Sequence, residues 1–180
     1  LQHIENLVRM ETRDANAEGQ GAIGIGELIR AALRMHPTRI LIGEVRGREA
    51  LDLLQAMNTG HDGSFSTGHG NSPRDMLSRL ETMVLMAADL PLPAIRSQIA
   101  SAIDVMVHVA RLRDSSRKVT AIEEVDRYEN GEIVLNPLYR FQESGLADGK
   151  TALAGKVEGK LMRTGELRHK EKLRLAGLEL

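Results

Sequence analysis

The sequence predicts an α/β fold with parallel strands in its first part and an antiparallel hairpin after them. The apolar run Ile40-Leu41-Ile42 shows no alternation, which is typical of a strand buried on both faces of a parallel sheet. Segments with helical periodicity alternate with short strand-like runs. Asn130-Gly131 separates two strand-like segments, 122–128 and 133–139, and is a strong hairpin signal. This order favours an α/β layer with antiparallel additions.

The elements follow in order from local patterns. Pro37 ends the first helix, because the residue before a proline disfavours the α conformation. Ser72-Pro73 opens a strongly amphipathic helix. The helix that Pro37 ends covers residues 27–35, and further helices are predicted over 49–57, 91–103 and 166–176. The predicted strands cover residues 8–12, 40–42, 64–67, 105–110 and 119–125.

The chain divides after about Phe141. Residues 144–159 contain four glycines and few bulky side chains, as a linker does. We therefore expect one folded domain over residues 1–141, followed by a linker and C-terminal tail over 142–180. The chain enters a patterned segment directly at Leu1, so we also expect its start to be a cut inside a larger protein.

Composition excludes several classes of protein. The 180 residues contain no Cys, which excludes a disulfide scaffold, a zinc knuckle and a thiol nucleophile. The formal net charge is −1, so we expect no general electrostatic grip on nucleic acid. No apolar run reaches the roughly 20 residues of a membrane span. The basic residues of the tail predict a solvated helix face, with a membrane-surface or acidic-partner patch as the alternative; they are Arg163, Arg168, Lys170, Lys172 and Arg174.

Two glycine-rich segments imitate nucleotide-binding motifs. Residues 19–24 fit G-x-G-x-x-G, but the preceding residues are polar where that motif needs an apolar strand. Residues 145–151 resemble a phosphate-binding P-loop, yet they have three residues between the glycines where four are required. We interpret both segments as loops.

A stronger candidate for chemistry follows the apolar run at 40–42. Glu44 stands at the C-terminal end of this predicted strand, and ligands bind at that edge of open parallel sheets. A carboxylate there can lie beside Mg²⁺ and orient an attacking water. The alternative is a structural acid near a helix N-terminus.

Two histidines follow in glycine-rich loops. His61, with Asp62 beside it, and His69 suggest a metal site, but no third ligand has the right spacing. Glycine-rich polar turns at a strand end suit a phosphate better. Arg13 and Arg46 are the arginines nearest these elements, and arginine clamps phosphate with paired hydrogen bonds. The alternative for all four is an exposed loop side chain. His3, His36, His108 and His169 show no partner pattern.

Three motifs occur in close succession: GEVRG at 43–47, QAMNTGHDG at 55–63 and the T-x-H-x-N pattern at 67–71. On these motifs the sequence resembles the type II/IV secretion ATPase superfamily, and within it the Flp/Tad pilus-assembly ATPase branch. The resemblance extends upstream through residues 8–35 and reaches the closing segment, 155–180.

The resemblance implies a RecA-like P-loop NTPase core that hydrolyses ATP with Mg²⁺. Glu44 matches the catalytic glutamate of the Walker B segment and an indirect contact to Mg²⁺. His61 and His69 match the two histidines of the His box, near the terminal phosphate. Arg13 matches an arginine around the phosphates, and Arg46 is a weaker match.

The resemblance also implies a hexameric ring at the cytoplasmic face of the inner membrane. Its partners are inner-membrane platform proteins, and it drives pilus assembly or secretion. A non-catalytic subunit that keeps the fold is the alternative function, and a conjugation-type motor moving protein or DNA is a third.

The family's P-loop and its strand lie upstream of the segment that begins here. Phosphate binding depends on that loop, so we expect this chain by itself not to hydrolyse ATP. The strand that carries the loop is central in the family's sheet, and we expect an unpaired edge and exposed apolar surface without it.

Overall fold

The computed structural model describes residues 4–144 and 156–178. The chain forms two compact units. Unit 1 comprises residues 1–68 and 83–89, and unit 2 comprises residues 69–82 and 90–180. The mixed α/β composition expected from the sequence is confirmed.

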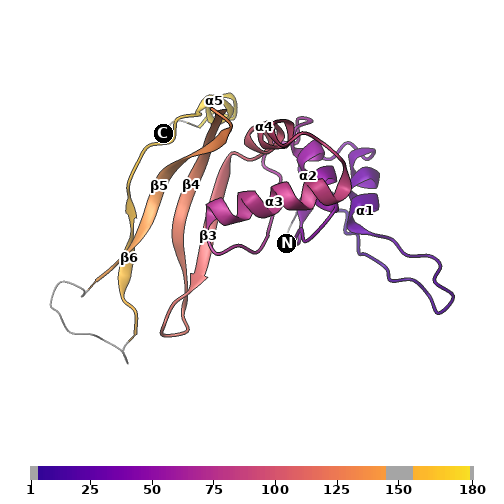
Figure 1. Cartoon of the computed structure of the whole chain (residues 1–180), viewed down its shortest axis with the longest axis horizontal. Helices are drawn as coiled ribbons and strands as arrows, with labels where there is room; N and C mark the ends of the chain where they lie inside the picture. The colour runs from indigo at the N-terminus through magenta and orange to yellow at the C-terminus, as the bar shows by residue number, and fades with distance from the viewer. Residues whose placement is uncertain (1–3, 145–155, 179–180) are drawn as a thin grey trace. The chain divides into compact units, whose positions relative to one another are not determined.

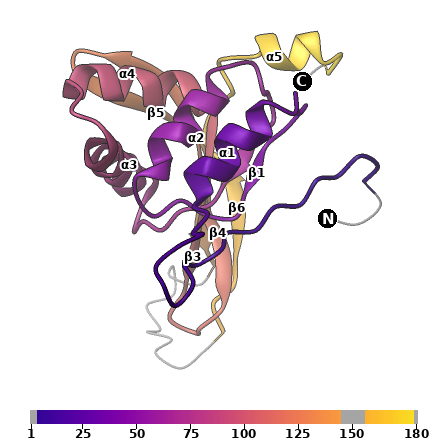
Figure 2. The same cartoon turned by 90° about the vertical axis from the view of Figure 1, so that its right-hand side faces the viewer.

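Unit 1 contains two helices and a pair of short parallel strands. Helices α1 (Ile25–Leu33) and α2 (Glu49–Met57) lie side by side (Figure 2). An ion pair of 2.8 Å between Arg30 and Asp52 links them. Strand β1 (Leu41–Ile42) runs parallel to β2 (Phe65–Ser66), with Leu41 opposite Phe65. The apolar core contains the fully buried side chain of Leu54 and its buried neighbours Ile29, Ile40, Ile42, Val45, Ala50 and Leu53.

Helices α3 (Pro73–Ala87) and α4 (Leu92–Ala102) begin where the sequence places them. The Ser72 hydroxyl accepts a hydrogen bond of 3.0 Å from the backbone N–H of Asp75, which satisfies one of the free donors of the first turn. Proline at the first helical position has no N–H to satisfy. Residues 73–82 of α3 belong to unit 2, and its last turn belongs to unit 1.

Unit 2 is built on a four-stranded antiparallel sheet (Figure 1). Its strands are β3 (Val105–Arg111), β4 (Arg117–Glu129), β5 (Glu132–Glu143) and β6 (Gly159–Arg163), paired in that order. The predicted hairpin is confirmed: Asn130 and Gly131 have φ of 52° and 84°, as a two-residue turn between twisted strands requires. Helix α4 packs against β4 and β5, and buries Ile95 and Ile99 completely.

The structure differs from the predicted elements at both ends of the chain. Residues 8–12 form no strand, and the extended chain makes a single antiparallel bridge between Arg13 and Ile23. The tail helix is shorter than predicted and covers only α5 (Glu171–Leu175). Residues 159–163, expected between linker and helix, instead pair with β5 as β6. A Cβ at Gly159 would lie 2.4 Å from the carbonyl oxygen of Gln142, so the close pairing depends on glycine.

The structure describes one of the two glycine-rich segments that resemble nucleotide-binding motifs. Among the described residues before Gly19 there is no strand, and Gly24 is the N-cap of α1. Residues 19–24 are therefore a loop and helix start, as interpreted. Residues 145–151 lie outside the described residues. None of the helices in the described ranges combines the length and apolar character needed to cross a bilayer.

Candidate functional site

The C-terminal ends of β1 and β2 lie next to each other and form the candidate site of unit 1. Thr67 follows β2, and its hydroxyl donates a hydrogen bond of 2.5 Å to the carbonyl oxygen of Gly43, which follows β1. The backbone N–H of Val45 donates to the carbonyl oxygen of Thr67 at 3.0 Å. These two bonds extend the parallel pairing beyond the strands and fix the backbone on either side of Glu44.

Glu44 is the carboxylate at this edge, with 34% of its side chain exposed. Its Oε2 accepts from Nε of Arg46 at 2.7 Å. The hydrogen bond from Arg46 to Glu44, with the attraction between the two charges, raises the pKa of Arg46. The structure therefore brings together two of the five predicted site residues, and the carboxylate remains within reach of water.

Glu49 holds the loop that carries Arg46. Its Oε1 accepts from the backbone N–H groups of Arg46 at 2.7 Å and Gly47 at 3.0 Å. Burial acts to raise the pKa of Glu49, but hydrogen bonds from backbone N–H groups outweigh it and lower that pKa. This carboxylate in the first turn of α2 is a structural acid.

His61 lies in the loop between α2 and β2. Its Nδ1 is 3.2 Å from the Thr59 hydroxyl and 3.2 Å from the carbonyl oxygen of Ala56 at the end of α2. The Ser64 hydroxyl donates to the carbonyl oxygen of His61 at 2.7 Å and accepts from the backbone N–H of Ile40 at 2.9 Å. The His61 loop is therefore tied both to α2 and to the start of the parallel pair.

The other two predicted residues lie elsewhere. Arg13 is exposed, and its Nε donates at 2.7 Å to the carbonyl oxygen of Gly21, closing the loop that leads to α1. His69 is exposed and is the first residue of unit 2. The two histidines of the predicted His box thus belong to different units.

The donor set suits an indirect contact to a metal ion. Within residues 4–144 and 156–178, no three His, Asp or Glu side chains gather in a way that would hold a metal. Mg²⁺ in phosphate-transfer sites is held by one or two carboxylates together with waters and substrate phosphates. The half-buried carboxylate of Glu44 fits that arrangement.

Sequence reasoning missed the residues that position Glu44. Thr67 was part of a recognised pattern but had no assigned role, and Ser64 was only the start of a strand. Hydroxyl residues at both ends of a two-residue strand are the signal that could have found them, since they satisfy backbone groups that so short a strand leaves open.

Comparison with known proteins shows the family of this chain. Residues 3–152 match the family model described as type II/IV secretion system protein. The match covers most of the chain, which therefore belongs to this family.

Individual relatives support the same conclusion. A putative conjugal transfer protein of Mycobacterium tuberculosis is 40% identical over 148 residues, which are 82% of this chain and 41% of that protein. The type IV secretion system protein PtlH of Bordetella pertussis is 46% identical over 112 residues, 61% of this chain and 32% of PtlH. The chain thus spans less than half the length of these relatives.

One solved structure is also similar. The VirB11 ATPase from the Brucella suis type IV secretion system, crystallised with sulphate, has a TM-score of 0.54 and 34% sequence identity. The similarity covers 57% of this chain and 32% of the VirB11 chain. The family therefore includes an ATPase, and part of this chain shares its fold.

Proposed function

We propose that this chain is part of an ATP-hydrolysing motor that powers secretion or pilus assembly across the bacterial envelope. The observation that carries the proposal is Glu44, two residues after β1, fixed by the contacts of Gly43 and Val45 with Thr67. In β1 itself Ile42 is buried but Leu41 is exposed, so the expectation of a strand buried on both faces was wrong. A carboxylate held in this place, beside a parallel neighbour, suits the positioning of water for attack on a terminal phosphate.

The proposed site residues have distinct roles. Glu44 orients the attacking water and accepts its proton. His61 and His69 contact the terminal phosphate, and Arg13 and Arg46 offset phosphate charge. Mg²⁺, when bound with ATP, neutralises charge on the phosphate oxygens. In this proposal the backbone N–H groups and the lysine of a P-loop are supplied by sequence outside these 180 residues. The M. tuberculosis relative is more than twice as long as the segment that matches this chain.

Two branches of the family supply candidate cargoes. The motifs resemble the Flp/Tad pilus-assembly branch, whose cargo is pilin. The names of the M. tuberculosis and B. pertussis relatives favour conjugal transfer and type IV secretion, whose cargo is protein or DNA. In either branch we propose a homo-oligomer, a hexameric ring, that works with inner-membrane platform proteins at the cytoplasmic face.

ATP turnover by the complete protein tests the proposal. We expect Glu44→Gln to lower kcat by at least about 100-fold, the scale of a lost general base. ATP binding should persist, because the substitution keeps the side chain's size. Asp89→Asn, which changes an exposed carboxylate after α3, is the matched control and should leave kcat unchanged.

The alternative function predicts another result. A non-catalytic subunit would show no Mg²⁺-dependent turnover in the complete protein, with or without Glu44. That outcome would overturn the motor proposal and leave assembly as the function.

A further inference from the structure

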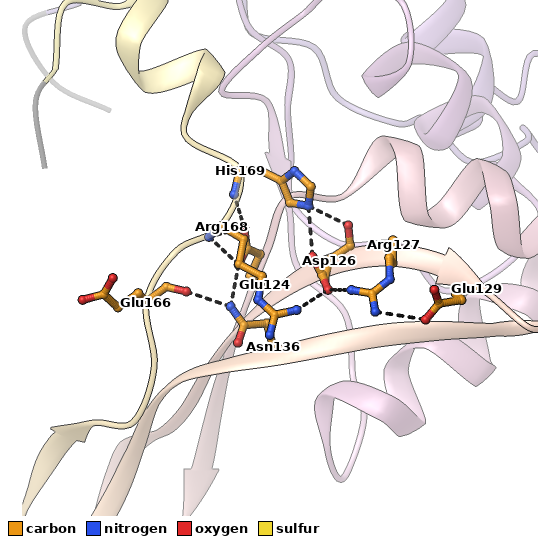
Figure 3. Close-up of polar contacts among 8 residues, drawn as sticks. All are labelled: Glu124, Asp126, Arg127, Glu129, Asn136, Glu166, Arg168 and His169. Atoms are coloured by element: carbon orange, nitrogen blue, oxygen red, sulfur yellow. Dashed lines mark hydrogen bonds and ion pairs between the residues drawn. The ribbon is translucent and has the colours of Figure 1, made fainter.

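Strand β4 carries three buried carboxylates, of which Glu123 pairs with Arg140 of β5 and the other two face a different set of partners. Glu124 is 1% exposed and Asp126 is 8% exposed. A buried charge is costly unless charged or hydrogen-bonding partners surround it. Most of these partners come from one distant segment near the C-terminus, residues 166–172, which we call the C-terminal strap (Figure 3).

Glu124 receives hydrogen bonds mainly from the backbone of the strap. The backbone N–H of Arg168 lies 3.0 Å from its Oε2, and that of His169 lies 2.8 Å from its Oε1. Nδ2 of Asn136 on β5 donates to Oε2 at 2.7 Å and also to the carbonyl oxygen of Glu166 at 2.8 Å. One carboxylate and one amide thus fix the strap backbone at three residues.

Asp126 receives the side chains of the strap. Nη1 of Arg168 donates to its Oδ2 at 2.6 Å, and Nε2 of His169 lies 3.1 Å from Oδ1 and 2.7 Å from the Asp126 carbonyl oxygen. Arg127 of β4 also pairs with Asp126. At the far end of the strap, Nζ of Lys172 pairs with Asp104 at 2.9 Å.

We propose that the C-terminal strap is a pH-sensitive element, docked on Glu124 and Asp126 most tightly when His169 is protonated. The charged groups that face His169 are Glu124, Asp126 and Arg127 from β4 and Arg168 from the strap. The two carboxylates attract the imidazolium, while the two guanidiniums are each bound to Asp126. The His169 side chain is 57% exposed, so it exchanges protons directly with solvent.

The sign of the pH dependence follows from these contacts. Burial acts to lower the pKa of His169, but its hydrogen bonds to Asp126 and the nearby carboxylates raise that pKa above the ordinary 6.5. The docking contribution of the charged ring is therefore complete below pH 6.5. It is lost as the pH rises through the raised pKa that His169 has in the docked strap. A neutral ring still donates one N–H, so docking weakens without being abolished.

The carboxylates act in the opposite direction. Burial acts to raise the pKa of Glu124 and of Asp126, but the strap's hydrogen bonds outweigh it and lower both. The carboxylates contribute to docking above their ordinary pKa values of 4.5 for Glu124 and 3.8 for Asp126. This contribution is lost as the pH falls through the lowered pKa values of the docked state. Docking is consequently tightest between about pH 5 and 6.5.

Hydrogen exchange of the strap tests this proposal. Protection factors for the amides of Arg168 and His169, corrected for the intrinsic rate at each pH, should fall roughly twofold to fivefold from pH 6 to pH 8.5, the scale of an exposed ion pair. His169→Gln should flatten this pH dependence. Arg174→Gln removes a positive charge from α5 and is the matched control, which should keep the wild-type profile.

An NMR titration of the His169 ring in the unmodified chain gives a second readout that needs no variant. A midpoint above 6.5 that coincides with movement of the Arg168 and His169 amide signals supports the strap. A midpoint at or below 6.5, or equal pH dependence of protection in wild type and His169→Gln, overturns it. Neither readout involves ATP, so the proposed motor function and the strap stand or fall separately.

Discussion

Thr67 is the residue that joins the ends of the two parallel strands in unit 1. Its hydroxyl donates to Gly43 and its carbonyl accepts from Val45, so both sides of Glu44 are tied to one position. The side chain is exposed, and the net stabilisation from its hydroxyl is accordingly modest. Its importance lies in the placement of Glu44.

We predict that Thr67→Val lowers the free energy of unfolding by about 0.5–1.5 kcal/mol, because it removes the hydroxyl and keeps the branched shape. Urea denaturation measures the change. Thr67→Ser restores the hydroxyl and should recover most of the loss. Equal losses for both variants would contradict a role for the Gly43 hydrogen bond.

Glu124 is a buried carboxylate that accepts hydrogen bonds from Asn136, Arg168 and His169. We predict that Glu124→Gln destabilises the chain by about 1–3 kcal/mol at pH 7, because an amide replaces an acceptor of three hydrogen bonds. Thermal or urea unfolding measures the loss. Glu129→Gln changes an exposed acid on the same strand and should cost less than about 0.5 kcal/mol.

Glu124 also makes the stability of the fold decrease in acid. Because its pKa is lowered in the folded state, Glu124 stabilises the fold above pH 4.5, and this contribution disappears as the pH falls further. The difference in stability between wild type and Glu124→Gln should therefore shrink in acid. A difference that stays constant from pH 7 to pH 3 would contradict the assignment.

At the scale of elements, Arg96 of α4 connects three parts of unit 2. Its Nε donates to Glu81 of α3 at 2.8 Å, and its Nη1 donates to the carbonyl oxygen of Gly131 in the β4–β5 turn at 2.5 Å. Nη1 also contacts Glu132 at the start of β5 at 3.1 Å. The side chains of Arg96 and Glu81 are 22% and 14% exposed, so this is a largely desolvated connection.

We predict that Arg96→Met destabilises unit 2 by about 1–3 kcal/mol, because Glu81 and the turn carbonyl lose their donor while the apolar stem is retained. Urea denaturation followed by circular dichroism measures it. Arg79→Met, at an exposed position of α3, is the control and should remain within about 0.5 kcal/mol of wild type. A similar loss in both variants would show that the effect is not specific to this connection.

The sequence predicted those elements whose signals are local. Helix α2 has the expected bounds, and the Asn130-Gly131 turn needs only its own two residues to bend. Strand β6 was missed because its pairing depends on β5, and Gly159 alone does not reveal a neighbour 16 residues away in the chain. Extended residues 8–12 were assigned to a strand, but the structure gives them no partner strand within the described ranges.

The same reasoning applies to the sites. Glu44 was predicted as a candidate site residue from an apolar run and the acid that follows it, and both signals are local in sequence. His169 was given no partner, and this was wrong: Asp126 lies 43 residues away in sequence and meets it only in the folded sheet. The basic tail was predicted to be a solvated helix face, yet Arg168 and Lys172 are ion-paired with β4 and with the residue before β3. The three acids at 123–126, which directly follow Ala121 and Ile122 in a strand, were the available signal.

At the scale of the whole molecule, the parallel sheet of unit 1 is short for an α/β fold. Among the described residues it consists of β1 and β2, and Phe65 on β2 is 56% exposed. The sequence analysis expected exposed apolar surface at this sheet, and the link of that surface to an absent neighbouring strand stays a prediction. The matched segment is 41% of the length of the M. tuberculosis relative.

We predict that the isolated 180-residue chain associates in solution, because an exposed strand edge with an apolar side chain favours contact with other copies. Sedimentation velocity measures the distribution of species. Phe65→Thr should reduce association and keep the β-branched shape suited to a strand. A monodisperse, cooperatively unfolding monomer would contradict this view of β2.

The motor proposal makes Glu44 the carboxylate of an ATPase site that also requires a phosphate-binding loop. The most direct measurement is Mg²⁺-dependent ATP turnover by the 180-residue chain and by the complete protein, side by side. We predict turnover by the complete protein and none by the isolated chain, since the phosphates are bound by the P-loop. Turnover by the isolated chain that Glu44→Gln abolishes, or a complete protein that is inactive under the same conditions, would contradict the claim.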